Sequence, residues 1–394
     1  MTDRSEYSES INLHNEHAGK IEITSKVEVN TVEDLSVVYT PGVSEVSRAI
    51  ADDETRANTL TARGNMIAVI TDGTAVLGLG DIGPKAAIPV MEGKSILFKQ
   101  LANVDAFPIS LDTKDTEEII SIIKALQPNF SGINLEDISA PRCFEIEKRL
   151  IEELDIPVFH DDQHGTAIVV LAALINGLKV VENEDINAKI IINGAGSAGI
   201  AIAKLLLEAG YKNITLVSLE GVLSKSETWL NSTQREIAEY TNIDNQRGTL
   251  DDVIQNADVF IGVSGPKALT KEHIKIMNDN PIIFALANPT PEIYPEEAYE
   301  AGASVVGTGR SDYPNQINNL LAFPGIFRGV LDAQTQHITT DMKIAAAKAI
   351  ASTIEDDELN TNYVIPNSLD KRVVEQVSES VKKCVRNQVE VLVK

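Results

Sequence analysis

The chain has 394 residues, 43% of them apolar, which predicts two or three globular domains with ordinary cores. Its formal net charge of -24 excludes unaided binding to nucleic acid or to an anionic membrane surface, because both attract cationic proteins. Two distant cysteines, a polar N-terminus and the absence of a run of about 20 apolar residues predict a cytoplasmic protein without disulfides, signal peptide or membrane span.

The first half of the chain alternates short apolar strands with helical patterns. Residues 66–83 predict two short strands separated by Asp-Gly. Further strands are expected within 107–113, 130–137 and 156–162, with amphipathic helices between them. Strands that alternate with helices form βαβ units, so a mostly parallel sheet is expected.

An apolar helix at 166–181 leads into a second series of strands and helices. It begins with a strand at 188–194, a glycine-rich turn and a helix, and it continues with strands near 213–219, 257–265, 281–289 and 303–309. In the C-terminal part of the chain, the apolar residues recur at helical spacing. We therefore expect an α/β protein with an N-terminal catalytic domain containing a parallel sheet at 1–165, a Rossmann-type dinucleotide-binding domain at 166–330 and C-terminal helices at 331–394.

Two segments that are predicted to be loops carry groups able to transfer protons. Tyr39 precedes Thr-Pro-Gly, a turn signal that fixes the backbone beside the phenol. Lys94 follows Glu-Gly and precedes an apolar run, which would partly desolvate the amine and lower its pKa toward that of a general base. Most lysines, however, are solvated and have no chemical role.

Two acidic pairs follow neighbouring predicted strands. Glu136 and Asp137 follow one strand, and Asp161 and Asp162 follow the next. Ligands bind at the carboxyl ends of strands in open α/β sheets, and Mg²⁺ or Mn²⁺ would neutralise carboxylates gathered there. The alternative is that each pair caps its own helix, for about 1 kcal/mol.

The segment "NGAGSAG" predicts a dinucleotide site. Gly194, Gly196 and Gly199 have the G-x-G-x-x-G spacing between an apolar strand and an apolar helix, with Ser197 and Ala198 in the same turn. A glycine-rich packing turn is the alternative. The next strand ends at Ser218 where an acid for the ribose of NAD is expected, and Glu220 lies two residues beyond, so NAD is favoured and NADP stays open.

Eight motifs in this order resemble the malic enzyme family in its short bacterial form. They are "VVYTPGV", "TDGTAVLGLGDIG", "IPVMEGKSILFK", "NLEDI", "VFHDDQHGTA", "NGAGSAG", "FALANPTPEI" and "PNQINNLLAFPGIF". The resemblance covers about residues 15–385. It implies oxidative decarboxylation of (S)-malate to pyruvate and CO₂ with NAD(P)⁺ and Mg²⁺ or Mn²⁺, usually by a homodimer.

The resemblance also implies a role for individual residues. Lys94 would be the general base on the C2 hydroxyl, Asp161 would orient Lys94, and Tyr39 would protonate C3 of enolpyruvate. The metal ligands would be Glu136, Asp137 and Asp162. Asn288, which also borders the cofactor site, and Asn319 would hold the substrate.

One departure and two rival interpretations accompany this resemblance. Long family members carry a substrate-binding arginine where this chain has Ala75, Val76 and Leu77, and no replacement is evident. One rival is a related activity: decarboxylation of oxaloacetate, or conversion of malate to lactate with the cofactor retained, which we expect only of longer relatives. The other is a dinucleotide-sensing protein whose acids only cap helices.

Overall fold

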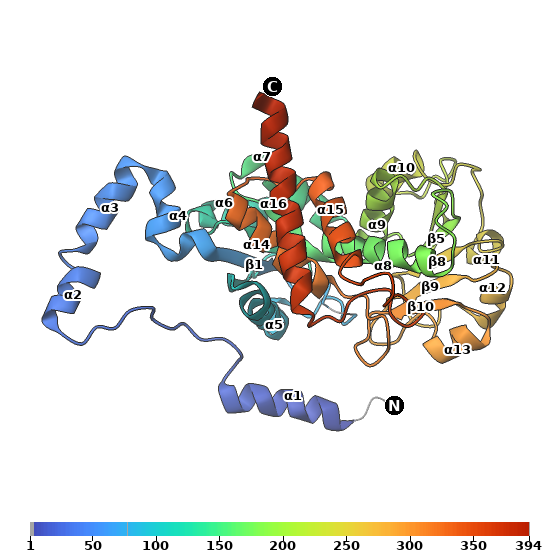
Figure 1. Ribbon diagram of the computed structural model, residues 1–394, viewed down its shortest axis with the longest axis horizontal. Coiled ribbons are helices and arrows are strands. Elements are labelled where there is room, and N and C mark those ends of the chain that lie inside the picture. Colours follow the sequence, from blue (N-terminus) through green and yellow to red (C-terminus); the bar gives the residue numbers. More distant parts are fainter. Residues whose placement is uncertain (1–3, 77, 394) are drawn as a thin grey trace.

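Two parallel sheets lie side by side and are joined by a buried helix. The computed structural model describes residues 4–76 and 78–393, with side chains characterised between residues 9 and 387. Figure 1 shows the first sheet and its helices on one side of the molecule and the second sheet on the other. This arrangement confirms the predicted fold class.

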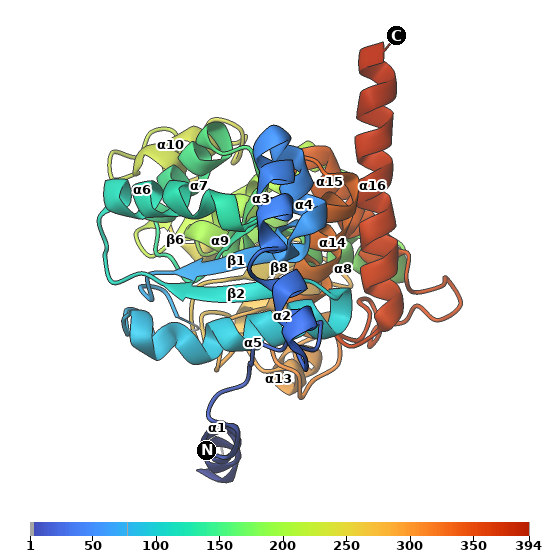
Figure 2. The same ribbon diagram turned by 90° about the vertical axis from the view of Figure 1, so that its left-hand side faces the viewer.

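The first sheet has four parallel strands in the order β2-β1-β3-β4. The strands are β1 (Met66–Thr71), β2 (Asp105–Ser110), β3 (Ile133–Leu135) and β4 (Val158–His160). Helix α5 (Pro84–Ala102) covers one face, and α6 (Thr116–Leu126) and α7 (Arg142–Glu153) cover the other (Figure 2). Asp115 caps α6 by accepting a hydrogen bond from the backbone N–H of Glu118.

The second strand expected within 66–83 does not form. β1 ends at Thr71, and in the described part of the following loop, residues 72–76 and 78–83, only the isolated bridge between Val76 and Gly80 is strand-like. Gly73, Gly78 and Gly80 have φ values of 70°, 74° and 75°, which a continuous strand cannot contain. The glycines therefore turn this segment across the carboxyl ends of the strands.

The segment around Lys94 is a helix, whereas we expected a loop. Pro84 occupies the first turn of α5, where its missing N–H costs nothing. The buried positions recur at helical spacing and include the lysine: Ala87, Met91, Lys94, Ser95, Phe98 and Ala102. Lys94 thus lies on the buried face of α5.

The second sheet has six strands in the order β10-β9-β8-β5-β6-β7, all parallel except β7. They are β5 (Ile190–Asn193), β6 (Ile214–Ser218), β7 (Gly221–Val222), β8 (Val259–Gly262), β9 (Ile282–Ala285) and β10 (Val305–Thr308). The helices of this half are α9 (Ser197–Glu208), α10 (Ser232–Ala238), α11 (Leu250–Val253), α12 (Lys271–Lys275) and α13 (Pro295–Glu300). This is the predicted Rossmann-type half.

Helix α8 (Thr166–Val180) follows the turn η4 (Asp161–Gly165) and joins the two halves. Its apolar side chains belong to one core cluster that includes residues of both sheets. Among the described residues, the segment 161–180 is long and apolar enough to span a membrane, although none was expected from the sequence; 72% of it is buried inside the protein, as in the core helix of a folded domain. Its hydrophobicity is therefore explained by packing.

The C-terminal segment packs on both halves. It contains η5 (Asn319–Leu321), α14 (Phe323–Ala333), α15 (Thr340–Ala351) and α16 (Lys371–Val393). Val377 and Val381 of α16 lie against Gly325 and Gly329 of α14, where a larger side chain would collide. The far end of α16 extends beyond the body of the protein (Figure 2).

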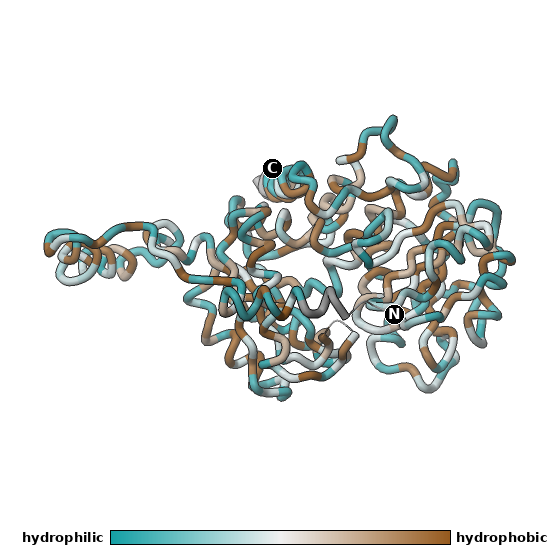
Figure 3. Tube along the Cα trace, turned by 90° about the horizontal axis from the view of Figure 1, so that it is seen from below, coloured by the Kyte–Doolittle hydropathy of each residue, from teal (hydrophilic) through white to brown (hydrophobic). Residues whose placement is uncertain are grey.

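Residues 21–60, which we call the N-terminal arm, extend away from the body (Figures 1 and 3). The arm contains α2 (Val32–Val38), α3 (Val43–Asp52), η1 (Glu54–Arg56) and α4 (Ala57–Leu60) and follows α1 (Arg4–His17); η2 (Ala62–Asn65) connects it to β1. Lys20 connects the start of the arm to α5, because the backbone N–H of Lys20 donates a hydrogen bond to Glu92 at 3.0 Å. No characterised side chain between residues 9 and 66 is buried.

Candidate active site

The two acidic pairs meet at the carboxyl edge of the first sheet. β3 and β4 are adjacent and parallel, with Leu135 opposite His160, so the residues that follow them lie side by side. Glu136, Asp137 and Asp162 each offer a carboxylate oxygen, and these oxygens lie within 4.8 Å of one another. The backbone N–H of Asp137 donates to Asp162 at 2.8 Å, which ties the two pairs together.

A wide π-type turn, η4, carries the second acidic pair between β4 and α8. Such turns are rare and are frequent at functional sites. Asp161 is fully buried, and the backbone of Gly165 packs directly against its carboxylate. A side chain at position 165 would collide with this carboxylate, so the turn requires glycine there.

Lys94 reaches the acid cluster from α5. Its ammonium forms a buried ion pair with Asp161, and it lies 3.2 Å from a carboxylate oxygen of Glu136. It also lies 4.2 Å from the ring centre of Phe323 at the start of α14. The structure therefore places Lys94 beside both acidic pairs.

The pKa of Lys94 is not lowered as we expected. Burial favours the neutral amine, but the carboxylates of Asp161, Glu136 and Asp162 outweigh burial and raise the pKa above its usual range. Burial in turn raises the pKa of Asp161 to about 7, although attraction to Lys94 opposes this shift. The expectation of a lowered pKa considered only the desolvation of Lys94. The resemblance implied its contact with Asp161, but the effect of this carboxylate and of Glu136 on the pKa was left out.

Of the two predicted substrate amides, the structure places Asn319 next to this cluster. Asn319 begins η5, and its Cβ would be 3.0 Å from a Cβ built on Gly165. Asn288 follows β9, and its carbonyl oxygen lies 2.5 Å from the position of a Cβ on Gly78. Asn288 therefore lies against the loop that follows β1.

Tyr39 does not join the cluster within this chain. It ends α2 in the N-terminal arm, and 66% of its surface is exposed. Figure 1 shows α2 at the far end of the arm, well away from β1 and α5. Within a single chain, Tyr39 therefore does not lie near Lys94, although the resemblance gives both residues a role in one active site.

The glycine-rich turn has the geometry that the motif predicts. Gly194 has φ of 125°, and a Cβ there would lie 2.5 Å from the carbonyl oxygen of Val263. Gly196 faces open space at the start of α9, where a pyrophosphate could approach the backbone. A Cβ on Gly199 would collide with the carbonyl oxygen of Gly194, so helix and strand pack closely only with glycine there.

The end of β6 carries the groups predicted to face the ribose. The hydroxyl of Ser218 donates to the carboxylate of Glu220 at 2.7 Å, and this bond lowers the pKa of Glu220. Lys225, which could attract a 2′-phosphate, instead lies 3.5 Å from Glu239. Glu220 is therefore the anionic group at this position.

Sequence reasoning missed the buried group beneath η4. Glu147 of α7 accepts hydrogen bonds from the backbone N–H of His160 at 3.0 Å and lies 2.8 Å from Nε2 of His164. The only signal was a glutamate at a position of α7 that the helical period predicts to be buried. Asp72 similarly forms a buried ion pair with Arg142 at 2.8 Å.

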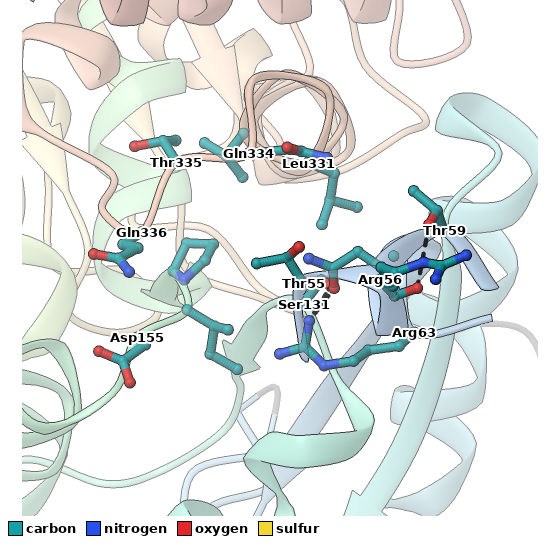
Figure 4. A pocket seen from close by; sticks show the side chains of 15 residues that line it. Thr55, Arg56, Thr59, Arg63, Ser131, Asp155, Leu331, Gln334, Thr335 and Gln336 are labelled. Carbon is teal, nitrogen blue, oxygen red and sulfur yellow. Dashed lines mark hydrogen bonds between the residues drawn. The ribbon is translucent and has the colours of Figure 1, made fainter. Parts of the chain in front are cut away.

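A separate cavity of about 470 Å³ lies at the opposite edge of the first sheet (Figure 4). It is bordered by the base of the arm, the segments that precede β3 and β4, and the end of α14. Figure 4 shows that Arg63 points into it. The guanidinium of Arg63 donates a hydrogen bond to Asn58. The acid cluster is not part of its lining, so this cavity is not the candidate active site.

Comparisons with known proteins agree with these features. Residues 18–151 match the model of the malic enzyme N-terminal domain, and residues 163–389 match that of the malic enzyme NAD-binding domain. The chain is 61% identical to an NAD-dependent malic enzyme of Geobacillus stearothermophilus over 92% of this chain and 76% of that one. It is 56% identical to a bifunctional malic/malolactic enzyme of Bacillus subtilis (strain 168), over 95% of this chain and 92% of that one.

A solved structure agrees as well. The NAD-dependent malic enzyme of Thermotoga maritima superposes with a TM-score of 0.91 at 50% identity, covering 94% of this chain and 98% of that one. The Bacillus subtilis relative corrects one expectation, since a protein named for malolactic activity aligns over 92% of its length and is therefore similar in length to this chain.

Proposed function

Because the chain belongs to the malic enzyme family and catalyses the oxidative decarboxylation of (S)-malate to pyruvate and CO₂, we propose that the cluster around Lys94 carries out this reaction. The observation that supports this proposal is the buried contact of Lys94 with Asp161 and Glu136. An amine beside carboxylates, at the carboxyl edge of a parallel sheet, is typical of an acid/base group in a ligand crevice.

Glu136, Asp137 and Asp162 would hold the divalent ion. Their oxygens form the donor set that Mg²⁺ and Mn²⁺ prefer, and an ion would compensate carboxylates whose pKa burial raises, to about 7 for Glu136 and about 6 for Asp162. When bound, the ion supplies Lewis-acid polarisation of the C2 oxygen, and the nicotinamide supplies an acceptor for the hydride.

We propose that Lys94 accepts the proton of the C2 hydroxyl. In the metal-free protein the carboxylates of Asp161, Glu136 and Asp162 raise the pKa of its amine, and a divalent ion held by Glu136 and Asp162 would weaken this attraction and lower the pKa toward that of a base. The position of the Lys94 amine is fixed by Asp161, which is completely buried and makes no other described ion pair. Asp161 is therefore proposed as the residue that orients the amine. Asn319, next to the same turn, and Asn288 are proposed to hold the substrate by their amides.

The nucleotide is proposed to bind at the second sheet, along the glycine-rich turn. Gly194, Gly196 and Gly199, with Ser197 and Ala198 at the start of α9, would receive the pyrophosphate. Ser218 and Glu220 would face the ribose, which fits the NAD-dependent relatives. We keep 1–165, 166–330 and 331–394 as the proposed domains, although residue 330 lies within α14.

We propose that the active unit is a homodimer in which the arm of one chain crosses to the other. The support is that α2 and α3 bury no residue, while Val32, Val37 and Tyr39 are exposed by 78%, 72% and 66%. Apolar surface of this kind is typical of an interaction site. The partner copy would then receive Tyr39 as the acid that protonates C3 of enolpyruvate.

A second candidate function is the conversion of malate to lactate and CO₂. It is favoured by the bifunctional malic/malolactic relative, to which the chain is 56% identical. In this variant, the hydride taken from C2 of malate would return to C2 of pyruvate before the cofactor leaves, so no reduced cofactor would accumulate. A cytoplasmic location is proposed from the two unpaired cysteines, Cys143 and Cys384.

The proposed function is tested with purified protein, (S)-malate, Mn²⁺ and NAD⁺ or NADP⁺ in parallel. Equal amounts of pyruvate and NADH are expected, at a higher rate with NAD⁺ than with NADP⁺. Lactate without net reduced cofactor would support the second candidate. Formation of neither pyruvate nor lactate would reject both assignments.

A further inference from the structure

Glu147 lies in the interior between α7 and the turn that carries Asp161 and Asp162. Only 5% of its surface is exposed, although glutamates are rarely buried. One carboxylate oxygen serves both of its contacts, with the backbone N–H of His160 at 3.0 Å and with the ring of His164 at 2.8 Å. These two histidines bracket the residues Asp161, Asp162 and Gln163.

A single buried carboxylate thus holds both ends of the turn. Because the oxygen of Glu147 only accepts hydrogen bonds, it holds the proton of His164 on Nε2. The His164 ring also packs against Phe159 of β4, with ring centres 5.6 Å apart. The turn is therefore fixed to α7 and to the sheet on either side of the acidic pair.

The carboxylate form of Glu147 is itself stabilised. Burial opposes its ionisation, but the contact with His164 and the attraction to the half-buried ammonium of Lys343 on α15 outweigh burial and lower the pKa of Glu147 to about 2. The groups that stabilise the carboxylate therefore come from η4 and α15. None of these groups belongs to the proposed set of metal ligands.

We infer that Glu147 is a positioning residue that sets the geometry of the metal-binding turn through His160 and His164. The inference rests on the proposed function, since it takes Asp162 to be a ligand. The side chain of His160 makes no capping hydrogen bond at the start of η4, so the bond from its backbone N–H to Glu147 is the anchor at this end of the turn. Groups that support metal ligands in this way typically alter metal affinity by about 10–100-fold when they are removed.

The test compares Glu147→Gln with Glu145→Gln, a matched change on the same helix. The Glu145 side chain is 61% exposed and lies 3.9 Å from Arg149, so its substitution should change nothing. Glu147→Gln keeps the size and one acceptor for His160 but removes the charge that holds His164. Binding of Mn²⁺ alone is measured by the loss of the free-ion signal in electron paramagnetic resonance, and binding of NAD⁺ by calorimetry.

For Glu147→Gln we expect the Mn²⁺ dissociation constant to rise at least about tenfold while the NAD⁺ affinity is unchanged. A merely structural role would lower the thermal stability and both affinities together. His164→Gln should have a similar effect, and the double variant should be little worse than either single one, because both act through one contact.

The outcomes separate the inference from the proposed function. If the unmodified protein binds Mn²⁺ but Glu147→Gln and His164→Gln bind it within twofold of that affinity, the inference is wrong and the metal site stands. If the unmodified protein binds no Mn²⁺, the proposed metal site is wrong and the inference falls with it. Should Glu147→Gln fail to fold, His164→Gln, which leaves the bond from His160 to Glu147 intact, decides the question.

Discussion

Lys94 on α5 and Asp161 at the start of η4 form a buried ion pair, although 67 positions separate them in the chain. Only 10% of the lysine side chain and none of the aspartate side chain is exposed. Because neither charge is compensated by water, the two groups hold each other in place. This pair connects the helix on one face of the first sheet with the turn that carries the second acidic pair.

Replacing Lys94 by arginine should stop turnover but keep the positive charge at this position and the binding of NAD⁺. Arginine keeps a positive charge beside Asp161 and Glu136, but its guanidinium does not accept a proton near neutral pH. We expect kcat to fall by at least about 100-fold, the usual contribution of a general base. Steady-state formation of NADH from malate measures this loss, and calorimetry should show little change in NAD⁺ binding.

The matched control is Lys99→Arg on the same helix. Lys99 is exposed and pairs with Asp105 at 2.8 Å, so this variant should keep full activity. If Lys94→Arg retained more than half of the wild-type rate, Lys94 would not be the general base.

Replacing Asp162 by asparagine should weaken binding of the divalent ion. Asparagine can still accept the hydrogen bond from the backbone of Asp137, so the turn keeps its shape while one anionic ligand is lost. The Mn²⁺ concentration for half-maximal activity should rise at least about tenfold. Asp155→Asn, at an exposed position on the other edge of the sheet, should leave this concentration unchanged.

Chelation gives an independent readout of the same site. Removal of divalent ions with EDTA should abolish malate oxidation by the unmodified protein, and added Mn²⁺ should restore it. Turnover that survives chelation would contradict the proposed role of Glu136, Asp137 and Asp162.

The parts of this structure that could be predicted from the sequence follow from local rules. The glycine-rich turn between β5 and α9 has its own spacing signal, and the convergence of the acidic pairs follows because neighbouring parallel strands end at one edge. Both depend on short stretches of chain. The one tertiary feature that the acidic pairs require is that β3 and β4 are adjacent in the sheet, and they are.

The parts that could not be predicted depend on contacts between distant segments. Lys94 was expected in a loop with a lowered pKa because its immediate neighbours are apolar. The helix was not expected, and the contact with Asp161, which lies 67 positions away, was implied only by the family resemblance and not by the local sequence. Glu147 likewise has no motif, since its function is defined only by His160 and His164 in the folded chain.

The metal-free protein should become less stable as the pH rises through about 7. Burial raises the pKa of Asp161 and Glu136 to about 7, whereas carboxyl groups of an unfolded chain titrate near 4. The folded state therefore binds protons more tightly, and the stability present at low pH is lost as the pH rises from about 4 to above 7. Melting temperatures in EDTA between about pH 6.5 and 8 measure this trend, because His160 and His164, whose pKa burial lowers, have the opposite effect at lower pH.

Two changes should reduce that dependence. Asp161→Asn removes one of the titrating groups and should flatten the curve, and saturating Mn²⁺ should flatten it by compensating the carboxylates. A metal-free protein whose melting temperature rises over this range, with no difference in Asp161→Asn, would contradict the assignment of these shifts.

Replacing Glu220 by glutamine should shift the cofactor preference toward NADP⁺. The carboxylate next to Ser218 would repel a 2′-phosphate, and removing one such repulsion of about 1.4 kcal/mol changes relative kcat/KM by roughly tenfold. Parallel rates with NAD⁺ and NADP⁺ measure the ratio. Glu236→Gln, which alters an exposed pair with Lys204 at 3.2 Å, is the control and should leave the ratio unchanged.

If the arm supplies Tyr39 to the partner copy, two inactive variants should restore activity when they are mixed. Tyr39→Phe removes the proposed acid, and Lys94→Arg removes the proposed base. In a mixed dimer with crossing arms, one site receives both changes and the other receives neither. With random exchange of subunits, half of the dimers are mixed, so the mixture should reach roughly a quarter of the wild-type rate.

The same mixture also tests the alternative, in which each chain uses its own Tyr39. If each chain used its own Tyr39, every site in the mixture would lack either the phenol or the amine, and activity would stay at the level of the separate variants. Sedimentation must show dimers, and labelled chains must show that subunits have exchanged. Exchange without recovery of activity would place Tyr39 in the site of its own chain, which would require the arm to fold back from the exposed position in Figure 1.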